Sequence, residues 1–169
     1  MNVQTAIAHV YGDHIDTDRI IAGKYTKTLD MSFLADHVLE DLDPGFKNRV
    51  QPGDILVAGA NFGCGSSREQ APLALKAAGI RVVVANYFAR IFFRNAINIG
   101  LPVVEIGPHT IQPGSRVTVD LIKGVVVDED TGWSYQTAPL PDVMLAILQA
   151  GGLVTYLREN KQYGAERTI

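Results

Sequence analysis

The chain has 169 residues, 47% of them hydrophobic and 20% charged, which is typical of one folded globular domain and excludes a disordered chain. A net charge of -3 argues against general nucleic-acid binding, and no apolar run is long enough to span a membrane. A single cysteine excludes an internal disulfide and a metal cluster held by this chain's thiolates alone. The N-terminal residues lack a signal-peptide pattern, so a cytoplasmic location is expected.

Hydrophobic spacing predicts alternating strands and helices over the first 106 residues. In chain order these are a strand over 2–11, a helix over 31–42, a strand over 53–59, a helix over 69–78, a strand over 80–85, a helix over 87–99 and a strand over 103–106. In the helix over 87–99, the residues expected to face inward are Phe88, Ile91, Phe92 and Ala96.

The pattern becomes β-rich after residue 115 and helical again at the end. Strands are expected over 116–122, 124–127 and 133–135, followed by helices over 141–150 and 153–158. The fold class predicted is therefore α/β, with a β-rich addition after residue 115, in a single domain over 1–169.

The segment over 61–70 combines two glycines, two serines and an arginine between a predicted strand and a predicted helix. Gly63 and Gly65 permit a tight turn whose N–H groups converge on an anion. Ser66 and Glu69 have the spacing of a capping box for the helix that follows. From spacing alone, a structural turn and an anion-binding site are equally acceptable interpretations.

A second polar segment, over 12–21, places three aspartates and a histidine within six residues. It lacks the glycine and terminal glutamate of a calcium loop, so an autonomous metal site is disfavoured. Side-chain to backbone bonds within a turn explain the aspartates more simply. A third interpretation is that Asp18 holds a cationic or hydroxyl partner across a site.

Three motifs in this order resemble the swivelling domain of the aconitase superfamily and, more narrowly, the small subunits of 3-isopropylmalate dehydratases. They are Asp16-Thr17-Asp18-Arg19-Ile20-Ile21, Asn61-Phe62-Gly63-Cys64-Gly65-Ser66-Ser67-Arg68-Glu69, and the segment from Phe88 to Pro102. The resemblance implies a swivelling β/β/α domain in a two-subunit hydro-lyase. It also implies a [4Fe-4S] cluster held by a separate large subunit, with no metal bound by this chain.

The resemblance implies catalytic roles for Ser66 and Asp18. Ser66 matches the family's base, an alkoxide that removes a proton from the carbon beside a carboxylate. Asp18 matches an aspartate that orients groups in the cleft. Arg68 matches a carboxylate-binding arginine, whose planar fork suits that group, and Ser67 is an additional donor to substrate.

The segment over 23–28 falls where this family recognises the variable part of its substrate. Lys27 could pair with the third carboxylate of a tricarboxylate, which favours homoaconitase. Alternatively, Lys27 is solvated and Thr26 or Tyr25 faces the apolar branch of isopropylmalate, which is slightly preferred. A 2,3-dimethylmalate dehydratase and a stand-alone small-anion-binding module remain alternatives.

The expected partners are the large subunit and a small di- or tricarboxylate substrate, with no nucleic acid and no membrane. Isolated small subunits are expected to be able to self-associate through the surface meant for the large subunit. Arg90 and Arg94 share one helical face, and a structural or subunit-contact role is favoured for them over catalysis.

Overall fold

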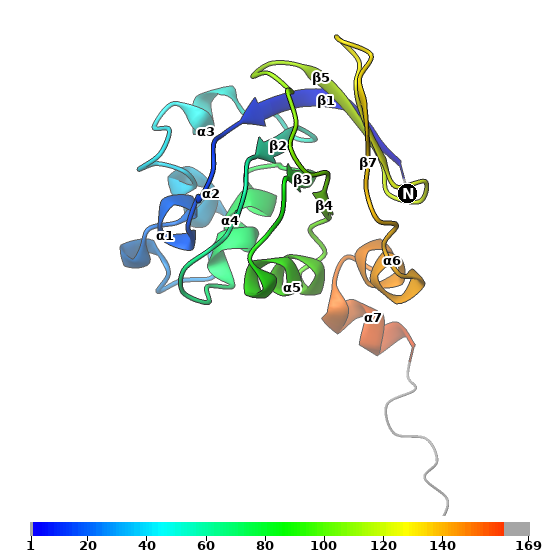
Figure 1. Cartoon of the computed structure of the whole chain (residues 1–169). Helices are drawn as coiled ribbons and strands as arrows, with labels where there is room; N and C mark the ends of the chain where they lie inside the picture. Colours follow the sequence, from blue (N-terminus) through cyan, green and yellow to red (C-terminus); the bar gives the residue numbers. More distant parts are fainter. Residues whose placement is uncertain (1, 161–169) are drawn as a thin grey trace, which may run out of the picture.

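The computed structural model describes residues 2–160, which form a mixed sheet covered by helices (Figure 1). Residue 1 and residues 161–169 of the predicted domain lie outside this range. The strands are β1 (Asn2–Val10), β2 (Ile55–Ala58), β3 (Val82–Ala85), β4 (Val103–Glu105), β5 (Arg116–Asp120), β6 (Val125–Asp128) and β7 (Ser134–Gln136). Their order across the sheet is β4-β3-β2-β1-β5-β6-β7.

The long first strand joins a parallel half of the sheet to an antiparallel half. Its end, Ala8 to Val10, pairs in parallel with β2, which continues in parallel to β3 and β4. Its beginning, Asn2 to Ile7, pairs antiparallel with β5, which continues to β6 and β7. This arrangement confirms the predicted α/β class with a β-rich part after residue 115.

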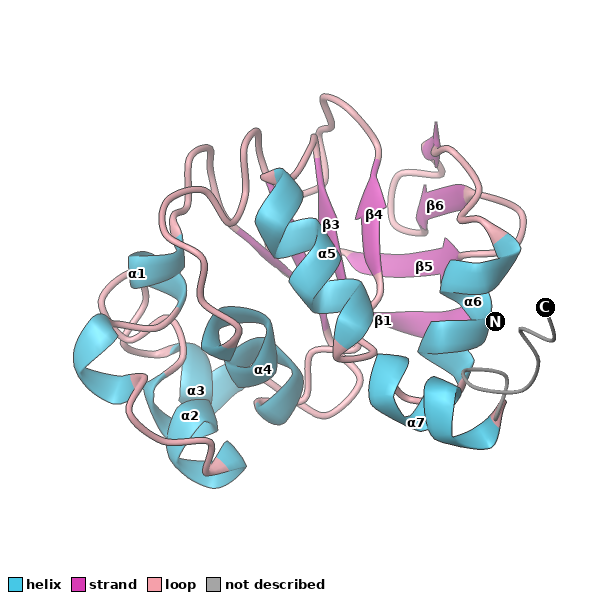
Figure 2. Ribbon diagram, turned by 90° about the horizontal axis from the view of Figure 1, so that it is seen from below, coloured by secondary structure: helices cyan, strands magenta, loops and turns pink. Residues whose placement is uncertain are grey.

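The two faces of the parallel half have different coverings, which Figures 1 and 2 show as helices on one side and curled strands on the other. Leu56 and Ala58 of β2 pack into the helical core, whereas Ile55 and Val57 pack against the strands of the antiparallel half. The helices are α1 (Thr17–Ile20), α2 (Met31–His37), α3 (Phe46–Arg49), α4 (Gln70–Ala77), α5 (Arg90–Asn98), α6 (Asp142–Gln149) and α7 (Leu153–Glu159), with a 3₁₀ turn η1 (Gly23–Tyr25). Among the described residues, no helix has the length and apolar character needed to cross a membrane.

Three details of the predicted helices are wrong. The helix expected over 87–99 begins only at Arg90, because Ala89 is extended. The helix expected over 31–42 ends at His37, because Val38 becomes extended and Leu39 adopts a positive φ of 56°. The N–H of Leu39 then donates to the carbonyl of Ile20 at 2.8 Å, which ties this turn to the end of α1. In α5, Phe92 and Ala96 are buried as expected, but Ile91 lies on the outer side and is 50% exposed.

Candidate active site

The turn between β2 and α4, residues 61–68, is called the serine turn below and lies at the carboxyl end of β2. On one side it is fixed to the segment before α5. The N–H of Phe62 donates to the carbonyl of Tyr87 at 3.2 Å, and the N–H of Ala89 donates to the carbonyl of Phe62 at 2.9 Å. The buried ring of Phe62 packs edge-on against Phe92, with ring centroids 5.1 Å apart. The serine turn therefore rests on α5.

The other side of the serine turn is fixed to the loop that follows β1. The N–H of Gly63 donates to the carbonyl of Ile15 at 2.8 Å, and the N–H of Thr17 donates to the carbonyl of Cys64 at 2.9 Å. The hydroxyl of Thr17, a residue only 3% exposed, donates to the carbonyl of Ser66 at 2.9 Å. Because β1 and β2 are parallel neighbours, their following loops meet at one edge of the sheet.

Gly63 is required at its position for two independent reasons. Its φ is +77°, and an added Cβ would lie 2.2 Å from the ring of Phe92. We expect Gly63→Ala to lower the free energy of unfolding by about 2–4 kcal/mol, because strain at positive φ and overpacking against the ring both act. Denaturant unfolding measures this loss. Gly107→Ala is the matched control, since its φ is +68° but nothing lies within 4 Å of the added Cβ; an equal loss there would show that clash with Phe92 is unimportant.

Arg68 brings Ser66 and Asp18 together. Its Nη1 lies 2.7 Å from the Asp18 carboxylate in an ion pair, and its Nε donates to the Oγ of Ser66 at 3.1 Å. The Arg68 side chain is 22% exposed, whereas the Asp18 side chain is 59% exposed. Ser66 and Ser67 are both exposed. Asp18 thus has a cationic partner, as the third interpretation of this segment expected.

The predicted capping box at the start of α4 is wrong. The cap residue is Glu69, and it makes no capping hydrogen bond with its side chain. The Ser66 hydroxyl instead accepts from Arg68 and stays on the surface of the turn. The Ser66 oxygen is therefore directed to the Arg68 guanidinium and not to the start of the helix.

The segment over 23–28 approaches the serine turn through Gly23. An added Cβ there would lie 3.0 Å from Nη1 of Arg68, so the guanidinium occupies the space that a side chain at Gly23 would need. The ring of Tyr25 stacks on His37 at 3.9 Å and is therefore directed toward α2. Thr26 closes its own turn by donating to the carbonyl of Gly23 at 2.8 Å, and Lys27 is exposed.

The structure thus places the predicted site residues in two groups. Ser66, Arg68 and Asp18 form one bonded cluster with Ser67 beside it, while Tyr25, Thr26 and Lys27 lie on the adjoining segment. Two residues that sequence reasoning did not assign to the site, Thr17 and Gly23, position this cluster. Their spacing in the sequence carries no signal of it, because both contacts join segments far apart in the chain.

The aspartate-rich segment acts as a set of turns, as its simpler interpretation predicted. The Asp13 carboxylate accepts from the N–H of Ala60 at 2.7 Å, and the Asp16 carboxylate caps α1 by accepting from the N–H of Arg19 at 2.8 Å. Within residues 2–160, no three His, Cys, Asp or Glu side chains are grouped so that they could hold a metal ion.

Comparison with known proteins identifies the relatives of this chain. Residues 35–108 match the aconitase C-terminal domain family. A 3-isopropylmalate dehydratase small subunit from Nautilia profundicola is 49% identical over 95% of this chain and 100% of its own length. Small subunit 1 from Methanopyrus kandleri is 54% identical over 89% of this chain and 90% of its own.

A solved structure supports the same relationship. The crystal structure of 3-isopropylmalate dehydratase from Methanocaldococcus jannaschii superposes with a TM-score of 0.90 at 44% identity, covering 96% of this chain and 97% of the other. Near full-length identity of this level, together with the shared fold, shows that the chain belongs to the family of 3-isopropylmalate dehydratase small subunits.

Proposed function

We propose that this chain is the small subunit of a two-subunit, cytoplasmic hydro-lyase that interconverts 2-isopropylmalate and 3-isopropylmalate by dehydration and rehydration in leucine biosynthesis. The observation that carries the proposal is the cluster of Ser66, Arg68 and Asp18 at an exposed edge of the sheet. The names of the relatives supply the substrate and the reaction class. The chain acts as one swivelling domain over 1–169.

In the proposed mechanism, Arg68 binds a carboxylate of the substrate. A guanidinium has five N–H donors in a planar fork. Asp18 engages Nη1 and Ser66 engages Nε, and we assign the Nη2 donors to the substrate carboxylate. Asp18 is a positioning residue here, since it fixes the plane of the guanidinium. Ser67 donates its hydroxyl to the same substrate.

Ser66 serves as the base that removes a proton from the carbon beside that carboxylate. A serine hydroxyl is a weak acid, so its oxyanion needs a positive group in direct contact. The N–H at Nε of Arg68, 3.1 Å from Oγ, is such a group. The same guanidinium therefore aligns the substrate carboxylate and stabilises the base beside the carbon that loses its proton.

The remaining half of the chemistry belongs to the large subunit. Cys64 is the one cysteine of the chain, whereas a [4Fe-4S] cluster is held by several cysteine thiolates. The described residues contain no group of three His, Cys, Asp or Glu side chains that could hold a metal ion. Both observations support a cluster that is held by the large subunit. When bound there, the cluster supplies a Lewis-acidic iron for the hydroxyl group that leaves. The exposed position of Ser66 is suited to closure against such a partner.

The substrate is tested by reconstitution with the cognate large subunit under anaerobic conditions, comparing isopropylmalate, homoaconitate and 2,3-dimethylmalate. Isopropylmalate should have the highest kcat/KM, and Lys27→Ala should change it less than about threefold, because Lys27 is exposed. Preference for homoaconitate, with a loss of more than about tenfold in Lys27→Ala, would reassign the chain to homoaconitase. Anion binding by the chain alone without any turnover would support the binding module.

A further inference from the structure

One face of the segment around α5 combines exposed apolar and cationic side chains. Tyr87 is 48% exposed and Ile91 50% exposed, and Arg90 and Arg94 are exposed as well. Arg90, Ile91 and Arg94 have the spacing of one side of helix α5, and Tyr87 lies in the extended segment just before it. These four residues are called the α5 stripe below. Burying Phe92, Ala96 and Ile97 against the sheet leaves the α5 stripe without a covering layer in the described part of the chain.

A groove of about 510 Å³ runs beside the α5 stripe, between α5 and α6, and is called the α5–α6 groove. Its walls are mainly apolar, with Arg90 and Arg94 along one side and the half-exposed Val143 along the other. Its lining residues are Phe88, Arg90, Phe93, Arg94, Ile97, Asn98, Glu105, Val143, Met144 and Ile147. The groove thus offers an apolar floor with two cations at its rim.

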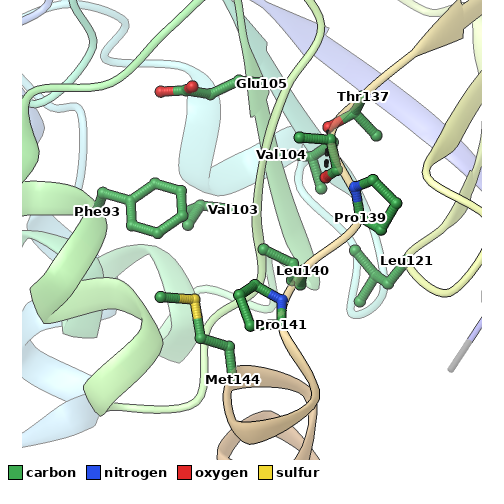
Figure 3. Close-up of a pocket in the computed structure, with 11 residues that line it drawn as sticks. Phe93, Val103, Val104, Glu105, Leu121, Thr137, Pro139, Leu140, Pro141 and Met144 are labelled. Atoms are coloured by element: carbon green, nitrogen blue, oxygen red, sulfur yellow. Dashed lines mark hydrogen bonds between the residues drawn. The ribbon is translucent and has the colours of Figure 1, made fainter.

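A smaller apolar cavity of about 190 Å³ adjoins the groove, because Phe93, Glu105 and Met144 line both. In Figure 3 the ring of Phe93 lies on the α5 side of this cavity, and Leu140, Pro141 and Met144 lie together at the start of α6. The cavity extends the apolar lining of the groove to Val103 and Val104 of β4.

The charges of the groove are not balanced within residues 2–160. Neither Arg90 nor Arg94 forms an ion pair with a described carboxylate, and each side chain is exposed. Glu105, the one carboxylate that lines the groove, accepts a hydrogen bond from the N–H of Phe88 at 2.9 Å. The rim therefore carries positive charge that suits a partner with carboxylates.

The start of the α5 stripe is hydrogen-bonded to the serine turn of the candidate active site. Its first residue, Tyr87, accepts the hydrogen bond from Phe62 of the serine turn, and Ala89, just before Arg90, donates back to Phe62. Ser66 and Asp18 are exposed in the chain alone. Because a proton-abstracting serine works best where water is excluded, whatever covers this site also lies against the start of α5.

Building on the proposed function, we propose that the α5 stripe and the α5–α6 groove form the docking surface for the large subunit. The large subunit inserts apolar side chains into the groove and places carboxylates against Arg90 and Arg94. Tyrosine, arginine and methionine are the residue types enriched at such interfaces, whereas lysine is depleted. All three enriched types occur here, in Tyr87, the two arginines and Met144, and no lysine lines the groove.

The test is the affinity of the full chain for the cluster-bearing large subunit, measured by titration under anaerobic conditions at two salt concentrations. Arg90→Glu/Arg94→Glu should weaken binding at least about 100-fold, and the salt dependence of the wild type should be lost or inverted. The matched control is Lys47→Glu/Arg81→Glu, which changes the net charge equally at exposed positions on α3 and before β3. Binding by this control should change less than about threefold. Equal thermal unfolding midpoints verify that the variants fold.

Turnover separates docking from catalysis. At saturating large subunit, the kcat of Arg90→Glu/Arg94→Glu should return to within about twofold of wild type, since neither arginine touches the reacting atoms. Wild-type affinity in this variant would overturn the proposal, as would a kcat that stays low at saturation.

Altered self-association of the isolated chain without weaker large-subunit binding would show instead that the surface meets a second copy. A wild-type complex that forms but does not turn over isopropylmalate would refute the proposed function and leave the docking result standing.

Discussion

Ser66→Ala should reduce the kcat of the reconstituted dehydratase by about 10²–10⁴-fold, because it removes the oxygen that we assign as the base. The expected loss lies in kcat, since Arg68 still binds the substrate carboxylate. Steady-state turnover of isopropylmalate at saturating large subunit measures it. The change removes one exposed hydroxyl, so folding and large-subunit affinity should stay as in the wild type.

Ser67→Ala is the matched control, because it deletes the same atom from the next residue of the same exposed turn. Loss of one hydrogen bond to substrate should lower kcat/KM by about tenfold or less. If Ser67→Ala were the more damaging change, the base would have to be reassigned to Ser67. If Ser66→Ala kept kcat within a few-fold of wild type, a serine base would be excluded altogether.

The second large effect is expected from Arg68→Lys, which keeps the charge but removes the planar fork. Lysine cannot at once reproduce the hydrogen bond from Nε to Ser66, the ion pair of Nη1 with Asp18 and the contact of Nη2 with the substrate carboxylate. Loss of two charge-assisted hydrogen bonds predicts a fall in kcat/KM of about 10²–10⁴-fold. Steady-state kinetics at several isopropylmalate concentrations measure KM and kcat separately. We expect KM to rise and kcat to fall, because Arg68 binds the substrate and also stabilises the Ser66 base.

Asp18→Asn provides the comparison for Arg68→Lys. It keeps the shape of the side chain and one oxygen acceptor but removes the negative charge, so the guanidinium is held less firmly. We expect a smaller loss than in Arg68→Lys, with partial function retained. A loss in Asp18→Asn that exceeds the one in Arg68→Lys would contradict a positioning role and would indicate that Asp18 itself contacts substrate.

The sequence was sufficient to predict the features that depend on neighbouring residues. The strand expected over 80–85 forms as the buried strand β3, and the glycines of the serine turn follow the strand β2. Features that join distant segments were harder to predict. The ion pair between Asp18 and Arg68 depends on β1 and β2 lying side by side. The residue pattern alone therefore gave a cationic partner for Asp18 as only one of three interpretations, and it did not identify Arg68 as that partner.

The errors in the prediction also have a common physical cause. The apolar residues over 31–42 keep helical spacing as far as Leu42. In the structure the N–H of Leu39 donates to the carbonyl of Ile20 in α1, and the helix ends early, at His37. Ser66 fits a capping box by spacing, yet its oxygen binds the Arg68 guanidinium. In both places a contact from elsewhere in the fold overrides the local preference.

The position of β1 at the centre of the sheet has a consequence for how the chain folds during synthesis. Its end pairs with β2, but its beginning pairs with β5, so that Asn2 lies opposite Asp120. During synthesis, β1 therefore keeps an open hydrogen-bonding edge until residues 116–120 have also emerged from the ribosome. Such long-range closure slows folding, and a nascent chain stalled before β5 presents that open edge to other chains and to chaperones.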